Sequence, residues 1–244
     1  MPLTRPAAGG EFRKRNTFLP WLMKTVRNKI EQNRRMETMC DTIFYPILIL
    51  DSRSEIEKAK EFQILHYNWG GDYRPNTYGR MGVLRDKGLV VRMTCEEIPP
   101  EAVCHTNNGP VYQDSAMEFF FCLDSSRTGY FNFEINSAGA VLAQFGPDRA
   151  HREFLSGELL ATCDCCVQVL EDSWQVDLFV PFSLIKEVQG KPGLTAGDRV
   201  TCNFYKIREN PDQMHFASCF PIENPTPNFH LPQFFGNAVV VEAI

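Results

Sequence analysis

The chain has 244 residues, of which 43% are hydrophobic and 23% charged, and its formal net charge is −5 at pH 7. These fractions are typical of a globular protein, and the length fits one large domain or two small ones. The charge is uneven, because residues 1–40 carry a balance of +6 and the rest of the chain −11. An acidic body argues against a nucleic-acid partner, since binding to phosphates requires a basic surface.

The cysteines and the N-terminal sequence indicate the compartment. Nine cysteines are an odd number, and their spacing does not suggest a disulfide framework. The longest N-terminal apolar run, residues 18–23, is too short for a secretory signal, and no stretch has the length of a transmembrane helix. We therefore expect a cytoplasmic protein with reduced thiols, which would be extracellular only if the native N-terminus differs from the one given.

Residues 1–42 are predicted to be a basic N-terminal extension outside the folded domain. Phe18, Leu22, Val26 and Ile30 recur at four-residue spacing among Lys and Arg, which is typical of a short amphipathic helix. Such a helix would bind a membrane surface or a protein partner. The alternative is a disordered extension, because helices this short are marginal on their own.

From residue 43 the pattern changes to short strands. Ile43–Leu50 is an apolar run, in which Pro46 favours an edge position in a sheet. Ser54–Glu57 has the capping pattern of a short helix. Met81–Leu84 and Leu89–Glu96 are separated by four turn-forming residues, which predicts a hairpin.

The clearest two-residue alternation lies further along the chain, with one helical segment expected at Pro181–Val188. The strands predicted from it are Met117–Asp124, Tyr130–Asn136, Trp174–Val180 and Val200–Ile207. Short strands at regular spacing indicate an all-β protein, here an antiparallel β-sandwich of the jelly-roll type with one or two short helices. No convincing linker interrupts residues 43–244, which we therefore predict to form one domain.

Successive side chains of a strand point to opposite sides, so the residues of each predicted strand can be assigned to two faces. Trp174 shares its face with Val176 and Leu178 and is predicted to lie in the core. The outward residues are unusually rich in amides, carboxylates and planar groups: Arg92, Glu118, Asn132, Glu134, Asn203 and Tyr205. They are either an ordinary solvated face or the fixed hydrogen-bonding groups of a sugar-binding site.

Five segments, in order over roughly residues 62–243, resemble the carbohydrate-binding module family 9-like domains, which are DOMON-like β-sandwiches. Each segment is weakly specific alone, but the ordered set is fairly specific. They are residues 114–121, residues 130–139, residues 174–182, residues 197–207 and residues 228–236.

The resemblance implies a jelly-roll module that binds a saccharide or glycan end without transforming it, as in domains attached to glycoside hydrolases that act in carbohydrate catabolism. Members with known ligands hold a terminal sugar between two Trp side chains, and here Trp69 alone is well placed for this. We expect Trp69, assisted by Tyr78, to provide the stacking surface and His230 to close the site. The outward polar residues named above would bind the hydroxyl groups.

Two other functions remain open. The first is a protein-interaction or degenerate sandwich domain that has lost affinity for sugars. The second is a glycoside hydrolase, with Glu118 and Glu134 as its paired carboxylates, since adjacent antiparallel strands could bring them to the required separation. No residue in the sequence obviously raises the pKa of one of these carboxyls over the other.

Metal and haem sites are weaker alternatives, and no cofactor is expected to be required. Cys163–Cys166 contains three thiols, but their spacing is not that of a zinc ribbon. The family resemblance implies an occasional structural calcium, for which Asp114 is the candidate, although an Asp before a strand is more often a turn former. Four residues could serve as axial haem ligands: His66, Met81, Met93 and His105.

Overall fold

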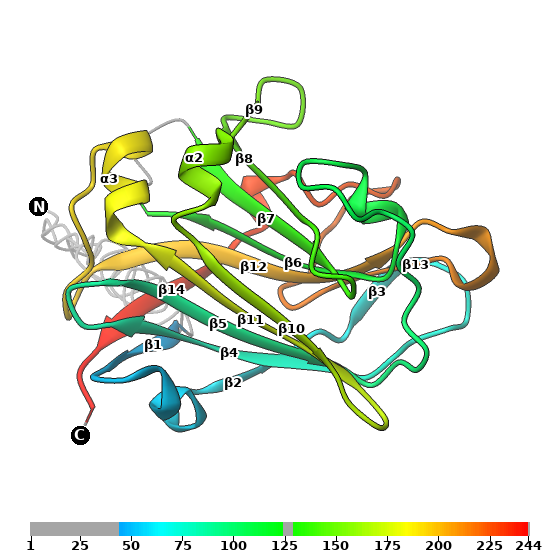
Figure 1. Ribbon diagram of the computed structural model, residues 1–244, viewed down its shortest axis with the longest axis horizontal. Coiled ribbons are helices and arrows are strands. Elements are labelled where there is room, and N and C mark those ends of the chain that lie inside the picture. The colour runs from blue at the N-terminus through cyan, green and yellow to red at the C-terminus, as the bar shows by residue number, and fades with distance from the viewer. Residues whose placement is uncertain (1–43, 124–128, 244) are drawn as a thin grey trace, which may run out of the picture. The chain divides into compact units, whose positions relative to one another are not determined.

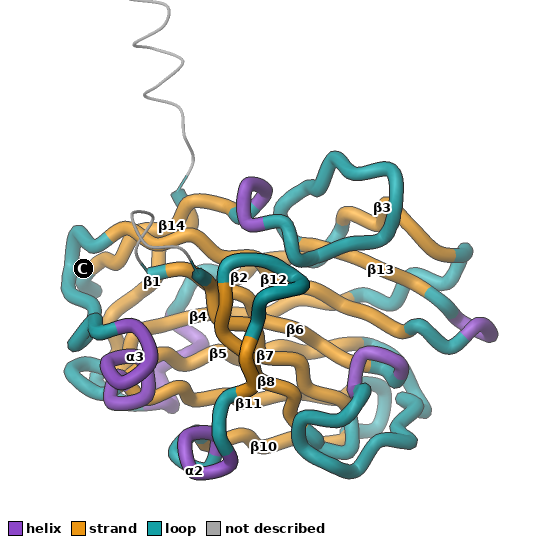
Figure 2. The backbone as a smooth tube through the Cα atoms, turned by 90° about the horizontal axis from the view of Figure 1, so that it is seen from above, coloured by secondary structure: helices purple, strands orange, loops and turns teal. Residues whose placement is uncertain are grey.

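The computed structural model describes residues 44–123 and 129–243. The predicted extension 1–42, with its amphipathic stripe, lies outside the described residues. Within them, the strands form one continuous hydrogen-bonded sheet that curls into two facing layers (Figure 1). Helices are few and short and lie at the ends and edges of the strands (Figure 2). No helix in the described part of the chain is long and apolar enough to cross a membrane.

The strands predicted from the sequence all form, and the two layers also contain strands that were not predicted. The first layer contains β2 (Glu61–Gln63), β4 (Thr77–Leu84), β5 (Gly88–Cys95), β10 (Asp164–Val169) and β11 (Trp174–Pro181). The second contains β6 (Ala116–Cys122), β7 (Tyr130–Asn136), β8 (Val141–Gly146), β9 (Glu153–Phe154), β12 (Arg199–Arg208) and β14 (Gly236–Val241). Two further strands extend the second layer beyond β12, namely β13 (His215–Ser218) and β3 (His66–Gly70).

The main core lies between the layers and is built from alternate residues of facing strands. Trp174 and Val176 of β11 belong to the same buried cluster as Phe119 of β6 and Phe204 of β12. Trp174 is completely buried, as its strand pattern predicted. Phe119 stacks on Phe204 with ring centroids 5.3 Å apart, and such aromatic pairs add stability beyond their buried area. The prediction of an all-β sandwich is therefore confirmed.

Strand β1 (Tyr45–Leu50) lies inside the sheet, where it pairs in parallel with both β14 and β4. The expectation that Pro46 places this strand at an edge is therefore wrong. The expectation that the whole sheet is antiparallel is wrong too. Pro46 is tolerated because it is opposite Val239 of β14, whereas the pairing with β4 begins only at Leu48. The N–H that proline lacks is therefore not needed for a hydrogen bond to β4.

Local sequence signals account for the turns and short helices. The predicted hairpin joins β4 to β5, and Asp86 adopts the left-handed conformation that a tight turn needs. Glu55 caps the 3₁₀ turn η1 (Arg53–Lys58), because its carboxylate accepts the backbone N–H of Asp51 at 2.9 Å. The predicted helical segment forms α3 (Phe182–Gln189), which ends at Gly190 with φ of 77°. The remaining short helical segments are η2 (Val111–Gln113), α2 (Gly157–Leu160), η3 (Pro211–Gln213) and η4 (Pro232–Phe234).

The outer face of the second layer is not solvated over its whole length. A second buried cluster forms there, in which Phe120, Tyr130 and Tyr205 of the strands pack under Phe229 and Phe235 of the C-terminal segment. That segment, residues 219–235, joins β13 to β14. It covers much of the polar face predicted from alternation, so those side chains face away from the main core but are buried.

Candidate functional site

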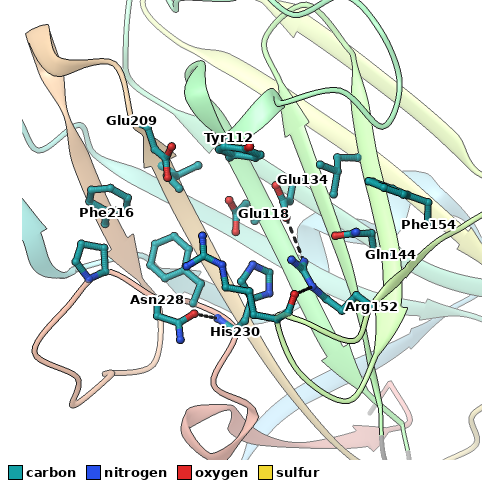
Figure 3. A pocket seen from close by; sticks show the side chains of 15 residues that line it. Tyr112, Glu118, Glu134, Gln144, Arg152, Phe154, Glu209, Phe216, Asn228 and His230 are labelled. Atoms are coloured by element: carbon teal, nitrogen blue, oxygen red, sulfur yellow. Dashed lines mark hydrogen bonds and ion pairs between the residues drawn. The ribbon is translucent and has the colours of Figure 1, made fainter.

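A pocket of about 270 Å³ opens where the covering segment leaves the outer face of β6 and β7 exposed to a cavity (Figure 3). Residues from several distant stretches line it. They are Tyr112, Glu118, Glu134, Leu142, Gln144, Arg149, Arg152, Phe154, Ile207, Glu209, Phe216, Pro227, Asn228, Phe229 and His230. Carboxylates, guanidinium groups and two amides thus share the cavity with several aromatic rings, which is the composition of a pocket that recognises a small polar ligand.

Two glutamates form the base of this pocket. Glu118 of β6 and Glu134 of β7 stand directly opposite each other across the antiparallel pair. Their Cβ atoms are therefore about 4.5–5.5 Å apart. Both residues are almost fully buried, and Oε2 of Glu134 has no hydrogen-bond partner among the described residues. Because buried acceptors are normally satisfied, this oxygen is spare hydrogen-bonding capacity in the pocket wall.

Burial and mutual repulsion keep the two carboxyls from ionising together. Burial raises the pKa of Glu118 well above its ordinary value, and the neighbouring Glu134 raises it further. Burial also raises the pKa of Glu134 to about 7, although Arg152 and the Asn132 hydrogen bond oppose this shift. At neutral pH the pair therefore holds at least one proton, so the site offers both a donor and acceptors.

The pair should make stability depend on pH. A carboxyl whose pKa is raised by folding stabilises the protein below its unfolded pKa, and this contribution is lost as the pH rises. For Glu134 this stabilisation is lost between pH 4.5 and about pH 7, and the loss in the free energy of unfolding is on the order of 3 kcal/mol. We expect Glu118→Gln to reduce the total loss of stability, because it removes a second carboxyl whose pKa is raised by burial and by Glu134. Urea unfolding at pH 5 and pH 8 measures it, and an unchanged difference between the two pH values would contradict the assignment.

Arg152 reaches the carboxyl pair because the chain turns tightly after β8. A Cβ on Gly146 would lie only 2.6 Å from the Cα of Arg152, so glycine permits this close approach. The Arg152 guanidinium then donates to Oδ1 of Asn132 at 3.1 Å and lies 3.9 Å from Oε1 of Glu134. Asn132 itself donates to Oε1 of Glu134 at 3.1 Å. Arg152 and Asn132 thus fix the orientation of the Glu134 side chain.

His230 also lines the pocket and is a neutral ring. Burial, and then the nearby Arg152 and Arg149, lower its pKa to about 2. Its Nδ1 lies 3.0 Å from the hydroxyl of Tyr130, and its ring stacks on Phe120 with centroids 4.9 Å apart. Burial raises the pKa of Tyr130, so its hydroxyl stays protonated and shares one hydrogen bond with Nδ1 of His230. A neutral imidazole has one N–H donor and one acceptor nitrogen, so the second ring nitrogen offers one of these two roles to a ligand.

The sequence of the folded region identifies its family. The profile of carbohydrate-binding family 9 matches residues 49–240, which include both layers and all the residues that line the pocket. The chain belongs to carbohydrate-binding family 9. The resemblance inferred from the strand motifs is therefore confirmed. A comparison with curated proteins found no match.

Solved structures share this family 9 fold. A protein of Bacteroides uniformis ATCC 8492, provisionally assigned as carbohydrate-binding, superposes with a TM-score of 0.71 and 23% identity, over 80% of this chain and 97% of its own. Family 9 modules of Caldicellulosiruptor kristjanssonii in complex with glucose and with cellotriose give TM-scores of 0.58 and 0.57. Each is 12% identical to this chain; the glucose complex covers 82% of this chain and 97% of its own, and the cellotriose complex 83% and 95%.

The pocket of this family 9 chain brings together three of the predicted site residues, namely Glu118, Glu134 and His230. Two others lie just behind its wall. Asn132 orients Glu134, and Tyr205 stacks on the pocket residue Phe229 with ring centroids 4.2 Å apart. These five come from three strands and the C-terminal segment, so the pocket lies on the outer face to which strand alternation assigned Glu118 and Glu134.

The other four predicted residues lie outside the pocket. Asn203 is buried under the covering segment, where it donates to the carbonyl of Phe220 at 3.1 Å. Tyr78 and Arg92 belong to β4 and β5 of the other layer. Arg92 is ion-paired there with Asp177 at 2.6 Å and Glu57 at 2.7 Å. Strand alternation could not separate the outer faces of the two layers, because it carries no information about which strands are neighbours.

Trp69, the predicted stacking residue, supports the covering segment from β3. It is half-buried, and its indole N–H donates to the carbonyl of Asn224 at 3.0 Å. Its ring lies 6.1 Å from that of Phe229 and 6.5 Å from that of Phe216. Both of these phenylalanines line the pocket, whereas Trp69 does not. It therefore contacts the aromatic wall of the pocket from behind.

Several pocket residues were not predicted from the sequence. Arg149 and Arg152 come from the β8–β9 connection, Phe154 from the two-residue strand β9, and Tyr112 from η2. These segments have no strand alternation, so nothing in the local pattern marked them. Gln144 could have been found, because it lies opposite Asn132 on β8 and so continues the polar face.

The described residues give no support to the metal sites considered from sequence. Among them, no group of three or more His, Cys, Asp and Glu side chains could hold a metal ion. Asp114, the calcium candidate, uses Oδ2 to accept the backbone N–H of Cys104 and the amide of Asn136, each at 2.8 Å. Oδ2 of Asp114 thus holds Cys104 and Asn136 in place. Met93, one of the haem candidates, is fully buried in the main core.

Proposed function

We propose that the pocket over Glu118 and Glu134 binds a saccharide and that the protein acts as a non-catalytic carbohydrate-binding module. The observation that carries the proposal is the buried carboxyl pair, with one unsatisfied oxygen, at the base of a cavity walled by aromatic rings. Sugar hydroxyls both donate and accept hydrogen bonds, and a half-protonated carboxyl pair offers both roles.

The remaining wall suits the same ligand. Arg149, Arg152 and Asn228 supply further donors, and the His230 ring supplies one more polar nitrogen. Tyr112 and Phe229 supply apolar surface for the flat face of a sugar ring. Ligand specificity would come from Arg152, Asn228 and His230, because their hydrogen bonds to the protein already determine their orientation. The Caldicellulosiruptor modules were solved with glucose and cellotriose, which are therefore the first ligands to test.

Replacing either carboxyl should weaken binding without unfolding the protein. We expect Glu134→Gln to lower the affinity for a saccharide ligand about tenfold or more, since a hydrogen bond to a charged group contributes about 1.5–3 kcal/mol. A glycan-array screen of the full chain, including glucose and cellotriose, followed by calorimetry on any hit, measures this.

Glu171→Gln is the matched control, because Glu171 is an exposed glutamate outside the pocket. Equal affinities of Glu134→Gln and Glu171→Gln would place the binding site elsewhere. A blank array with folded protein would instead favour a protein-interaction domain. Release of reducing sugar by the wild-type chain, lost in Glu134→Gln, would favour a hydrolase.

A further inference from the structure

A second cavity lies on the other side of β12 from the pocket described above. Its volume is about 510 Å³. The residues that line it are Tyr73, Ile98, Pro99, Pro100, Glu101, Arg208, Asp212 and Gln213. Ile207 and Glu209 line the first pocket, whereas Arg208 between them lines the second, because successive residues of an extended chain point to opposite sides. The two cavities are thus back to back across the end of one strand.

Planar polar groups, held rigidly, line the second cavity. Arg208 is 8% exposed and forms an ion pair with Glu101. It also donates to the side chain of Gln213 at 2.5 Å, while Asn210 donates to Oε1 of Glu101 at 2.8 Å. The Nε of Arg208 has no hydrogen-bond partner among the described residues. These groups are therefore preorganised, and their donor capacity is not used up within the protein.

The rest of the cavity lining is largely apolar. It consists of Ile98, Pro99 and Pro100, which precede Glu101 in the chain, and of the ring of Tyr73. The side chain of Ile98 remains 45% exposed, although it lies beside two prolines. The cavity therefore combines apolar surface with fixed amide, carboxylate and guanidinium groups, as the first pocket does.

The charges of the lining residues limit the class of ligand. Arg208 is neutralised by Glu101, so it does not offer an excess of positive charge to a phosphate or carboxylate. Asp212 is the remaining charged group in the wall, and it repels anions. A neutral ligand rich in hydroxyl groups matches the mixture of donors and acceptors, and its apolar face matches the prolines and the tyrosine ring.

We propose that this cavity is a second saccharide-binding site, which makes the protein bivalent for the sugar units of an oligosaccharide or polysaccharide. The location of this second site does not depend on the function proposed above. Its ligand class rests on that proposed function, because both sites match a saccharide by the same hydrogen-bonding and apolar groups. Two sites on one rigid body would raise the overall affinity for a polymer above that for its fragments, provided that one polymer chain or neighbouring chains reach both.

The test is a titration of the ¹⁵N-labelled full chain with cellotriose, followed by amide chemical shifts and calorimetric stoichiometry. We expect two ligands per chain, with separate shift changes at Glu101 and Gln213 for the second site and at Glu134 and His230 for the first. Tyr73→Ala should weaken the second site about tenfold or more and leave the first unchanged. Tyr73→Phe should retain most of the affinity, and Tyr78→Ala is the matched control, since Tyr78 lines neither cavity.

The outcomes separate the two proposals. Shift changes confined to the first pocket, with one ligand per chain, would overturn the second site and leave the proposed function standing. Changes confined to Glu101 and Gln213 would overturn the first site alone. If neither region responds to cellotriose or to any glycan of the array, both proposals fail. Because the wild-type shifts report each site directly, the test holds even if Tyr73→Ala does not fold.

Discussion

Lys206→Met is expected to destabilise the protein by about 3–5 kcal/mol, because it leaves the charge of Glu97 buried without its main partner. Lys206 is fully buried, with Nζ 3.2 Å from Oε2 of Glu97, 3.0 Å from the hydroxyl of Ser115 and 2.9 Å from Nε2 of His215. Although burial raises the pKa of Glu97, Lys206 and the Ser115 hydrogen bond bring it below its ordinary value. The buried carboxylate therefore depends on this cluster.

Removing both charges should restore much of the loss. In the double variant Glu97→Gln with Lys206→Met, no charge of the pair remains buried, so we expect it to be more stable than Lys206→Met alone. Urea unfolding of the wild type, both single variants and the double variant gives the coupling free energy. Strictly additive effects would show that Glu97 and Lys206 do not stabilise each other.

Trp174→Ala is expected to cost about 3–5 kcal/mol, the usual loss for a large buried aromatic. Trp174 is completely buried in the main core, and its indole N–H lies 3.4 Å from Oε2 of Glu97. The substitution leaves a cavity between the layers that the rigid strands around it cannot close. Chemical denaturation measures the loss.

Trp69→Ala is the natural comparison, because Trp69 is the other tryptophan within the described residues. It is half-buried beneath the covering segment, so we expect a smaller loss of stability than for Trp174→Ala. We also expect weaker saccharide binding, since Phe229 and Phe216 would lose a supporting ring. A loss of stability as large as that of Trp174→Ala would contradict this distinction.

The amino-acid sequence by itself determined the layered fold and the face on which the pocket lies. Alternation in β6, β7 and β12 separated core residues such as Phe119 from outer-face residues such as Glu118, because successive side chains of a strand point to opposite sides. The pairing of Glu118 with Glu134 could also be anticipated, since β6 and β7 are consecutive strands and form an antiparallel pair.

Only the tertiary structure decided which outer-face residues share a site. Residues 219–235 fold back over the outer face of the second layer, so that His230 meets Tyr130, 100 positions earlier, and Asn203, 17 positions before Phe220, becomes buried. Contacts over such separations depend on how strands order themselves in the sheet, and local periodicity contains no signal for that order. For the same reason Arg92 was grouped with residues of the opposite layer, while Arg152, brought in by the turn at Gly146, was not recognised.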